Sequence, residues 1–186
     1  MTVQIHPDSY GTEVGRSDQR VTPNKNCAEL IVGLNHDLAG ELKSIMMYTY
    51  YSAMLTGPYR RELRSLFQSE IADEQGHAQF LSDKIAALGG QPTTDARPVA
   101  HADKPREMLE HVLKAEMQAI TGYTTRLREA DAFGDFGLKV VLENMIADET
   151  RHKEEVERIL AGWNDFNLDK AQSEDRWQDD GGPAVK

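Results

Sequence analysis

Cysteine is almost missing from this chain of 186 residues, which has only Cys27. A single cysteine cannot form an internal disulfide, and it cannot build a thiolate cluster or a zinc knuckle. The sequence also has no run of about 18 apolar residues, the length that crosses a bilayer, and no apolar signal segment near its start. We therefore expect a cytoplasmic protein without a membrane partner.

Basic residues are outnumbered, because the chain has 21 Lys and Arg against 31 Asp and Glu, for a net charge of −10. A protein that binds DNA through its phosphates needs a basic surface. The C-terminal stretch instead adds Asp179 and Asp180. Direct DNA binding is therefore not expected, whereas an acidic chain suits the handling of cations.

No segment alternates polar and apolar residues with a period of two, so the sequence predicts no strands. Apolar residues recur instead at helical spacing in four segments that end at glycine or proline, which predicts helices over residues 27–56, 59–88, 105–132 and 136–163. The first and last pairs are joined by short breaks, and the middle pair by the long polar connection 91–104. This order predicts an all-α four-helix bundle, built from two antiparallel hairpins and one long crossover.

The chain reads as one domain with polar extensions. Residues 1–27 contain several glycines and prolines without a sustained period, which predicts an N-terminal arm. The bundle is assigned to residues 28–163. Residues 164–186 are polar and acidic and finish at Gly181-Gly182-Pro183, so we expect a tail there.

One short motif is written twice. Residues 71–77 read Ile-Ala-Asp-Glu-Gln-Gly-His, and 75 residues later 146–152 read Ile-Ala-Asp-Glu-Thr-Arg-His. Each copy places a glutamate three residues before a histidine, Glu74 with His77 and Glu149 with His152, so each pair shares one helix face. Either pair alone could be a solvated polar face. Two pairs on two helices are four of the six ligands that hold two metal ions in a four-helix bundle.

Two further glutamates complete the set. Glu74 follows Glu41 by 33 residues and Glu149 follows Glu116 by 33, and each pair is centred on the turn of its hairpin. At about 1.5 Å per residue, all four carboxylates lie roughly 25 Å from a turn, in one layer of the bundle. Four buried carboxylates would be very costly to desolvate without cations. The spacing therefore predicts two divalent cations rather than a purely structural layer.

The ligand types indicate which metals fit. Four carboxylates and two imidazoles without a thiolate suit iron or manganese, and zinc would bind but would be redox-silent. Asp73 and Asp148 precede the repeated glutamates and are placed to accept a hydrogen bond from the free nitrogen of a histidine, on the same helix or across the bundle. Tyr48 and Tyr123 follow the first glutamate of each hairpin by seven residues, on the ligand stripe.

This combined pattern, over residues 28–163, resembles the ferritin-like superfamily and in particular bacterioferritin-type di-iron centres. The resemblance implies that Glu74 and Glu149 bridge two iron ions, that Glu41 and Glu116 are terminal ligands, and that His77 and His152 each bind one ion. It also implies a catalytic role for Tyr48, as an electron donor or a hydrogen-bond donor.

The chain departs from bacterioferritin at two places. Gln75 stands where the haem-ligating methionine would be, so haem is not expected. The C-terminal stretch lacks the apolar helix that lies at the four-fold pore of 24-subunit shells. A 12-subunit shell of the Dps-like type that carries a bacterioferritin-type centre is therefore expected at least as readily as a 24-subunit one.

The function implied is oxidation of Fe²⁺ with O₂ or H₂O₂, for iron storage, detoxification and protection against oxidative stress in a hollow homo-oligomeric cage. The alternative is a di-iron or di-manganese oxygenase or peroxidase that acts on a small substrate without storing mineral. Other polar residues carry less weight. His36 and His111 point away from the ligand stripe, and Glu70, one turn before Glu74, is assigned a solvated role.

Overall fold

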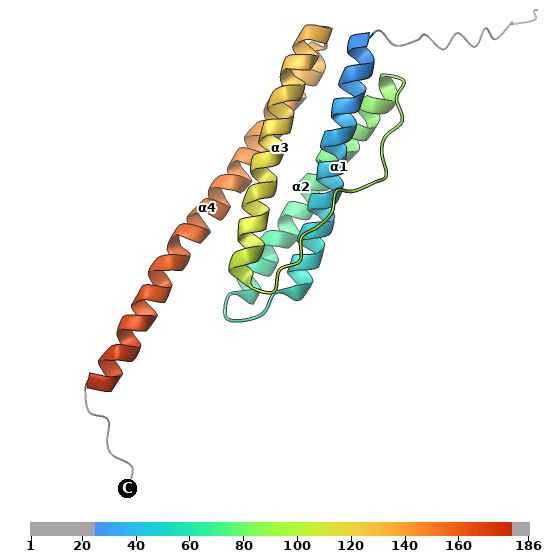
Figure 1. Ribbon diagram of the computed structural model, residues 1–186. Helices are drawn as coiled ribbons and strands as arrows, with labels where there is room; N and C mark the ends of the chain where they lie inside the picture. Colours follow the sequence, from blue (N-terminus) through green and yellow to red (C-terminus); the bar gives the residue numbers. More distant parts are fainter. Residues whose placement is uncertain (1–24, 180–186) are drawn as a thin grey trace, which may run out of the picture.

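The structure is a computed structural model that describes the backbone of residues 25–179 and the side chains of 26–163. Its four helices are α1 (Lys25–Met54), α2 (Arg60–Ala87), α3 (Pro105–Phe133) and α4 (Phe136–Asp179), and the described residues contain no strand. The helices form two hairpins, α1 with α2 and α3 with α4, and α1 also packs against α3 (Figure 1). The predicted all-α four-helix bundle is confirmed.

Glycine ends the helices where the hairpins turn. Gly57, in the turn after α1, has φ +84°, and Gly134, at the end of α3, has φ +87°. A residue with a Cβ atom is strained in this left-handed region, which is why the breaks could be predicted from the sequence. The N–H group of Gly134 donates to the carbonyl of Ala130 at 2.9 Å and so closes the last turn of α3.

The predicted end of the fourth helix at Trp163 is wrong, because α4 continues to Asp179. No glycine or proline occurs between Trp163 and Gly181, and polarity alone does not end a helix. The extended α4 reaches well beyond the other helices in Figure 1. Residues 1–24 of the expected arm and 180–186 of the expected tail lie outside the described residues, so the domain limits stay predictions.

The crossover between α2 and α3 runs along α1 (Figure 1) and is fixed to it by backbone groups. The N–H group of Arg97 donates to the carbonyl of Ala39 at 3.0 Å. The Tyr51 hydroxyl donates to the carbonyl of Ala100 at 2.8 Å. These contacts hold the crossover against α1, so that α3 begins beside the C-terminal end of α1.

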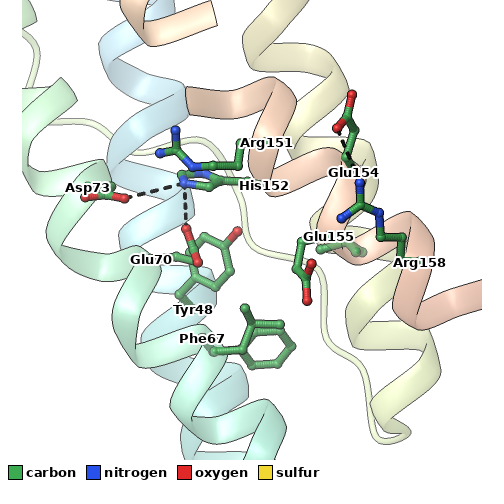
Figure 2. A pocket seen from close by; sticks show the side chains of 11 residues that line it. Tyr48, Phe67, Glu70, Asp73, Arg151, His152, Glu154, Glu155 and Arg158 are labelled. Atoms are coloured by element: carbon green, nitrogen blue, oxygen red, sulfur yellow. Dashed lines mark ion pairs between the residues drawn. The ribbon is translucent and has the colours of Figure 1, made fainter. Parts of the chain in front are cut away.

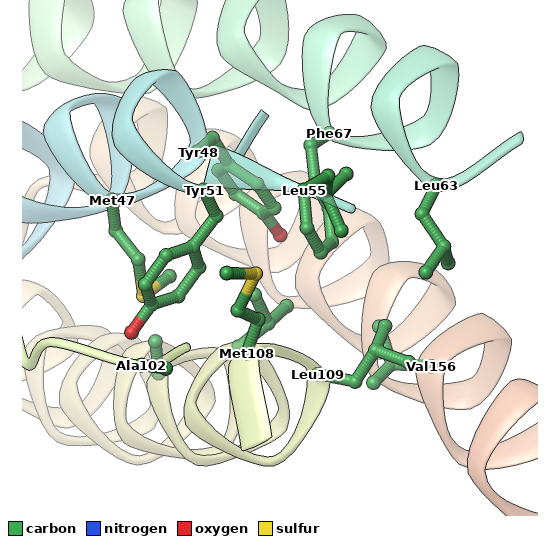
Figure 3. Close-up of a cluster of buried hydrophobic side chains, with 12 residues drawn as sticks. Met47, Tyr48, Tyr51, Leu55, Leu63, Phe67, Ala102, Met108, Leu109 and Val156 are labelled. Atoms are coloured by element: carbon green, nitrogen blue, oxygen red, sulfur yellow. The ribbon is translucent and has the colours of Figure 1, made fainter. Parts of the chain in front are cut away.

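Two apolar clusters fill the core, one above and one below a polar layer. The cluster near the α1–α2 turn contains Tyr51, Phe67 and Met108 (Figure 3), and the other contains Leu34 and Ile85. On every helix the buried ionisable residues of the predicted ligand set fall between the members of the two clusters. No described helix is apolar over a length that could span a membrane.

Candidate metal centre

The structure brings all six predicted ligand residues together in the polar layer. Each helix contributes from its middle, where the backbone is rigid and both neighbouring turns are hydrogen-bonded. The four glutamates are no more than 2% exposed and the two histidines no more than 8%. The residues are Glu41 on α1, Glu74 and His77 on α2, Glu116 on α3, and Glu149 and His152 on α4.

The six side chains form two overlapping groups. Within each group, one ligand atom from every residue lies within 4.8 Å of the others. We call these groups the His77 half-site and the His152 half-site. Both contain Glu74 and Glu149, so these carboxylates are placed to bridge two ions. The His77 half-site adds Glu41 and His77, and the His152 half-site adds Glu116 and His152.

Several buried ligand atoms make no hydrogen bond among the described residues, although His77 Nδ1 and Glu149 Oε1 lie 2.9 Å apart as an ion pair. They are Glu41 Oε2, Glu74 Oε1, both carboxylate oxygens of Glu149, and the Nδ1 atoms of His77 and His152. A buried polar atom without a partner costs about 1–3 kcal/mol, and more if it is charged. Divalent cations would satisfy all of these atoms at once. The donor set therefore fits two hard or borderline cations such as iron or manganese.

The opposite nitrogens of the histidines face acidic residues on the partner hairpin. Nε2 of His152 lies 2.8 Å from Glu70 Oε2 and 3.5 Å from Asp73 Oδ2 (Figure 2). Nε2 of His77 lies 3.7 Å from Asp148 Oδ2. The aspartates therefore approach the histidines across the bundle, at ion-pair distances. The solvated role expected for Glu70 is wrong, since its side chain is 14% exposed and contacts His152, a predicted ligand.

Two buried tyrosines hold the terminal glutamates. The Tyr48 hydroxyl on α1 donates to Glu116 Oε1 on α3 at 2.6 Å, and the Tyr123 hydroxyl on α3 donates to Glu41 Oε1 on α1. Each tyrosine thereby occupies one carboxylate oxygen and leaves the other for a cation. Only Tyr48 was assigned a role from the sequence. The 75-residue offset between Tyr48 and Tyr123 was the signal that identifies the second tyrosine.

Close packing of carboxylates shifts the pKa of three of them in different directions. Burial, reinforced by the negative charge of Glu41, raises the pKa of Glu74 well above its ordinary value. Burial and contact with Glu149 do the same for the pKa of Glu116. Burial also raises the pKa of Glu149, but contacts with Glu116, His152 and His77 outweigh it, so that pKa is lowered. The pKa of Glu149 therefore moves in the direction opposite to those of Glu74 and Glu116.

The two histidines are strongly basic in the same environment. Burial lowers the pKa of His77, but the carboxylates of Glu149, Glu41 and Glu74 outweigh it and raise the pKa to about 12. The pKa of His152 is raised to about 10, because contacts with Glu149 and Glu70 outweigh its burial. Binding of metal to these residues must therefore release protons.

His36 and His111 lie away from the centre, as their place on the helices predicted. Nδ1 of His111 lies 2.8 Å from the Tyr51 hydroxyl, and Nδ1 of His36 lies 3.1 Å from a guanidinium nitrogen of Arg97. Both therefore support the crossover or its anchoring on α1.

Residues 31–165 match the family model for ferritin, which describes a ferritin-like domain. The chain belongs to the ferritin family. The crystal structure of a ferritin-like, diiron-carboxylate protein from Bacillus anthracis superposes on this chain with a TM-score of 0.73. The two sequences are 47% identical, and the match covers 74% of this chain and 99% of that one.

Two other ferritin-like proteins extend the comparison. The bacterioferritin of Rhodobacter capsulatus is 28% identical over 138 residues, which are 74% of this chain and 86% of that protein. Its crystal structure, with a metal-free dinuclear site and haem iron, gives a TM-score of 0.67 over 74% of this chain and 86% of that one. A dodecameric thioferritin from Bacteroides fragilis shares the fold, at 20% identity and a TM-score of 0.71, over 77% of this chain and 90% of that one.

Proposed function

We propose that this ferritin-like protein is a di-iron ferroxidase that oxidises Fe²⁺ with O₂ or H₂O₂. The observation that carries the proposal is the set of buried, unpartnered ligand atoms in two half-sites that share Glu74 and Glu149. The likeness to a diiron-carboxylate protein at 47% identity supports iron as the metal. Manganese or zinc would be substitutes that fit the same donors.

Two bound Fe²⁺ ions would supply two electrons, enough to reduce O₂ to H₂O₂ or H₂O₂ to water. The protein's own residues fix the ions and control their surroundings. Glu74 and Glu149 would hold both ions, Tyr48 and Tyr123 orient Glu116 and Glu41, and the apolar clusters on both sides limit the access of bulk water. Tyr48 is the proposed catalytic tyrosine, because its hydroxyl reaches a terminal ligand.

Storage follows from the same proposal. The oxidised iron would collect as mineral inside a hollow shell of 12 or 24 copies, in the cytoplasm, and would protect the cell against oxidative stress. The matched bacterioferritin and the fold shared with a dodecamer support a shell. Haem is not expected because Gln75, exposed on α2, replaces the expected methionine ligand, and the net charge of −10 speaks against direct DNA binding.

Rapid mixing of Fe²⁺ with metal-free protein in air tests the ferroxidase. Ferric absorbance should rise quickly up to two irons per chain, and Glu74→Ala should abolish this phase because a bridging carboxylate is lost. The matched control is Gln75→Ala, since Gln75 is the next residue on α2 but is exposed. A normal rate in Glu74→Ala would refute the assignment of the site.

A second candidate function is an oxygenase or peroxidase that acts on a small substrate. A cleft of about 450 Å³ between α2 and α4 favours it, because Tyr48 and His152 line the cleft. Native mass measured with and without added Fe²⁺ separates the two. A shell of 12 or 24 chains that accumulates many irons per chain supports storage, whereas a monomer or dimer limited to two irons per chain supports the alternative.

A further inference from the structure

The 75-residue offset that relates the two hairpins fails at Glu70, beside the centre. Glu70 lies one helical turn before Glu74, and the residue one turn before Glu149 is Met145. The remaining members of the two half-sites correspond, glutamate to glutamate, histidine to histidine and tyrosine to tyrosine. The two halves therefore differ in whether a carboxylate lies one turn before the bridging glutamate. The offset also fails at Asp37, whose counterpart is Val112, but Asp37 pairs with Arg126 rather than with a histidine.

Because of this difference, the Nε2 atoms of His152 and His77 have different acidic neighbours. Glu70 Oε2 lies 2.8 Å from Nε2 of His152, an ion-pair contact that does not have the geometry of a hydrogen bond, and the Glu70 side chain is only 14% exposed. Among the described residues, the Nε2 atom of His77 has only Asp148 as an acidic neighbour, at 3.7 Å, and the Asp148 side chain is 37% exposed. Met145 is 2% exposed and offers no oxygen to His77. An acceptor behind a histidine fixes which nitrogen carries the proton and makes the other a better ligand.

Access differs between the halves as well. The cleft between α2 and α4 is walled by Tyr48, Glu70, Asp73 and His152, and Figure 2 shows both acids pointing toward the histidine ring. The residues that belong to the other half alone, Glu41 and His77, do not line this cleft. Glu41 instead borders a cavity of about 20 Å³, which has room for a single water molecule.

We propose that the two half-sites are inequivalent and that the His152 half-site fills first, because Glu70 positions its histidine and the α2–α4 cleft opens onto it. Glu70 is thus a positioning residue that makes the His152 half-site bind its cation more tightly than the His77 half-site. The inference rests on the proposed two-cation centre and adds the order in which the cations bind. The ligand class is a divalent cation, and a redox-silent ion reports on it without turnover.

The test is calorimetric titration of metal-free protein with Co²⁺ under nitrogen. Two binding steps are expected. His152→Ala should remove the tighter step and His77→Ala the weaker one. Glu70→Gln should weaken the tighter step by about 10–100-fold, the usual effect of losing a partner behind a metal-bound histidine, and leave the weaker step in place. Asp148→Asn should have a smaller effect, on the weaker step only.

The matched control is Glu154→Gln, which removes a carboxylate from the same cleft but pairs with Arg158 rather than with a histidine. It should leave both steps unchanged. Two ions bound in one indistinguishable step, or equal weakening of both steps by Glu70→Gln, would overturn the inference while the two-cation centre stands. Absence of Co²⁺ binding at both histidines would instead overturn the proposed function itself.

Discussion

The tyrosines that hold the terminal glutamates give the sharpest prediction about the energetics of the centre. Tyr123→Phe removes only the hydroxyl that donates to Glu41, and the ring keeps its place in a core where Tyr123 is fully buried. A hydrogen bond to a charged group contributes about 1.5–3 kcal/mol. The metal-free variant should therefore lose about that much free energy of unfolding, which corresponds to a fall in Tm of roughly 3–12 °C for a chain of this size.

The measurement is urea unfolding of metal-free protein, followed by circular dichroism. Tyr48→Phe should show a loss of the same order, because its hydroxyl makes the equivalent bond to Glu116 at 2.6 Å. The control is Tyr50→Phe, whose hydroxyl contacts His101 in an exposed position and should contribute little. Wild-type stability in Tyr123→Phe, or an equal loss in Tyr50→Phe, would show that the buried bond does not hold Glu41.

Two further predictions concern pH and packing. The pKa of His152 is raised from 6.5 to about 10, so the folded protein binds this proton more tightly, and the resulting stability is complete below pH 6.5 and lost as the pH rises toward 10. Thermal melts of metal-free protein should therefore show Tm falling over this range, and a flat or rising profile would contradict the assignment. Gly33→Ala should cost about 1–3 kcal/mol, because the new methyl group would overlap Arg126 and displace it from the buried carboxylate of Asp37. Gly76→Ala, which meets open space, should be neutral or stabilising in the same denaturation assay, and equal losses in both would discredit this explanation.

The positions of the six ligand residues could be predicted from the sequence because an α-helix has a constant rise per residue. Glu41 and Glu74 lie at equal distances from one turn, and Glu116 and Glu149 from the other, so helical rise alone brings them to one level. The turns themselves were marked by glycine. Period, spacing and turn chemistry therefore sufficed for the fold and for the grouping of these side chains.

Contacts between helices were harder to predict. Whether Glu70 reaches solvent or His152 depends on how α2 and α4 are rotated and spaced, which no pattern within one helix specifies. The bond from Tyr123 to Glu41 depends in the same way on the packing of α3 against α1. The end of α4 was missed for another reason, because a polar sequence without glycine or proline can remain helical.

The polar layer between the two apolar clusters makes the stability of the folded bundle depend on the concentration of the divalent cation proposed to bind there. The proposed cations would bind only the assembled layer, because the unfolded chain does not hold ligands from different helices together. By mass action, each tenfold rise in free cation above the dissociation constant adds about 1.4 kcal/mol per bound ion to the stability of the folded chain. If the proposed centre binds its two cations, the metal-free chain is therefore the less stable form of the bundle, and its unfolding free energy depends on the concentration of free metal.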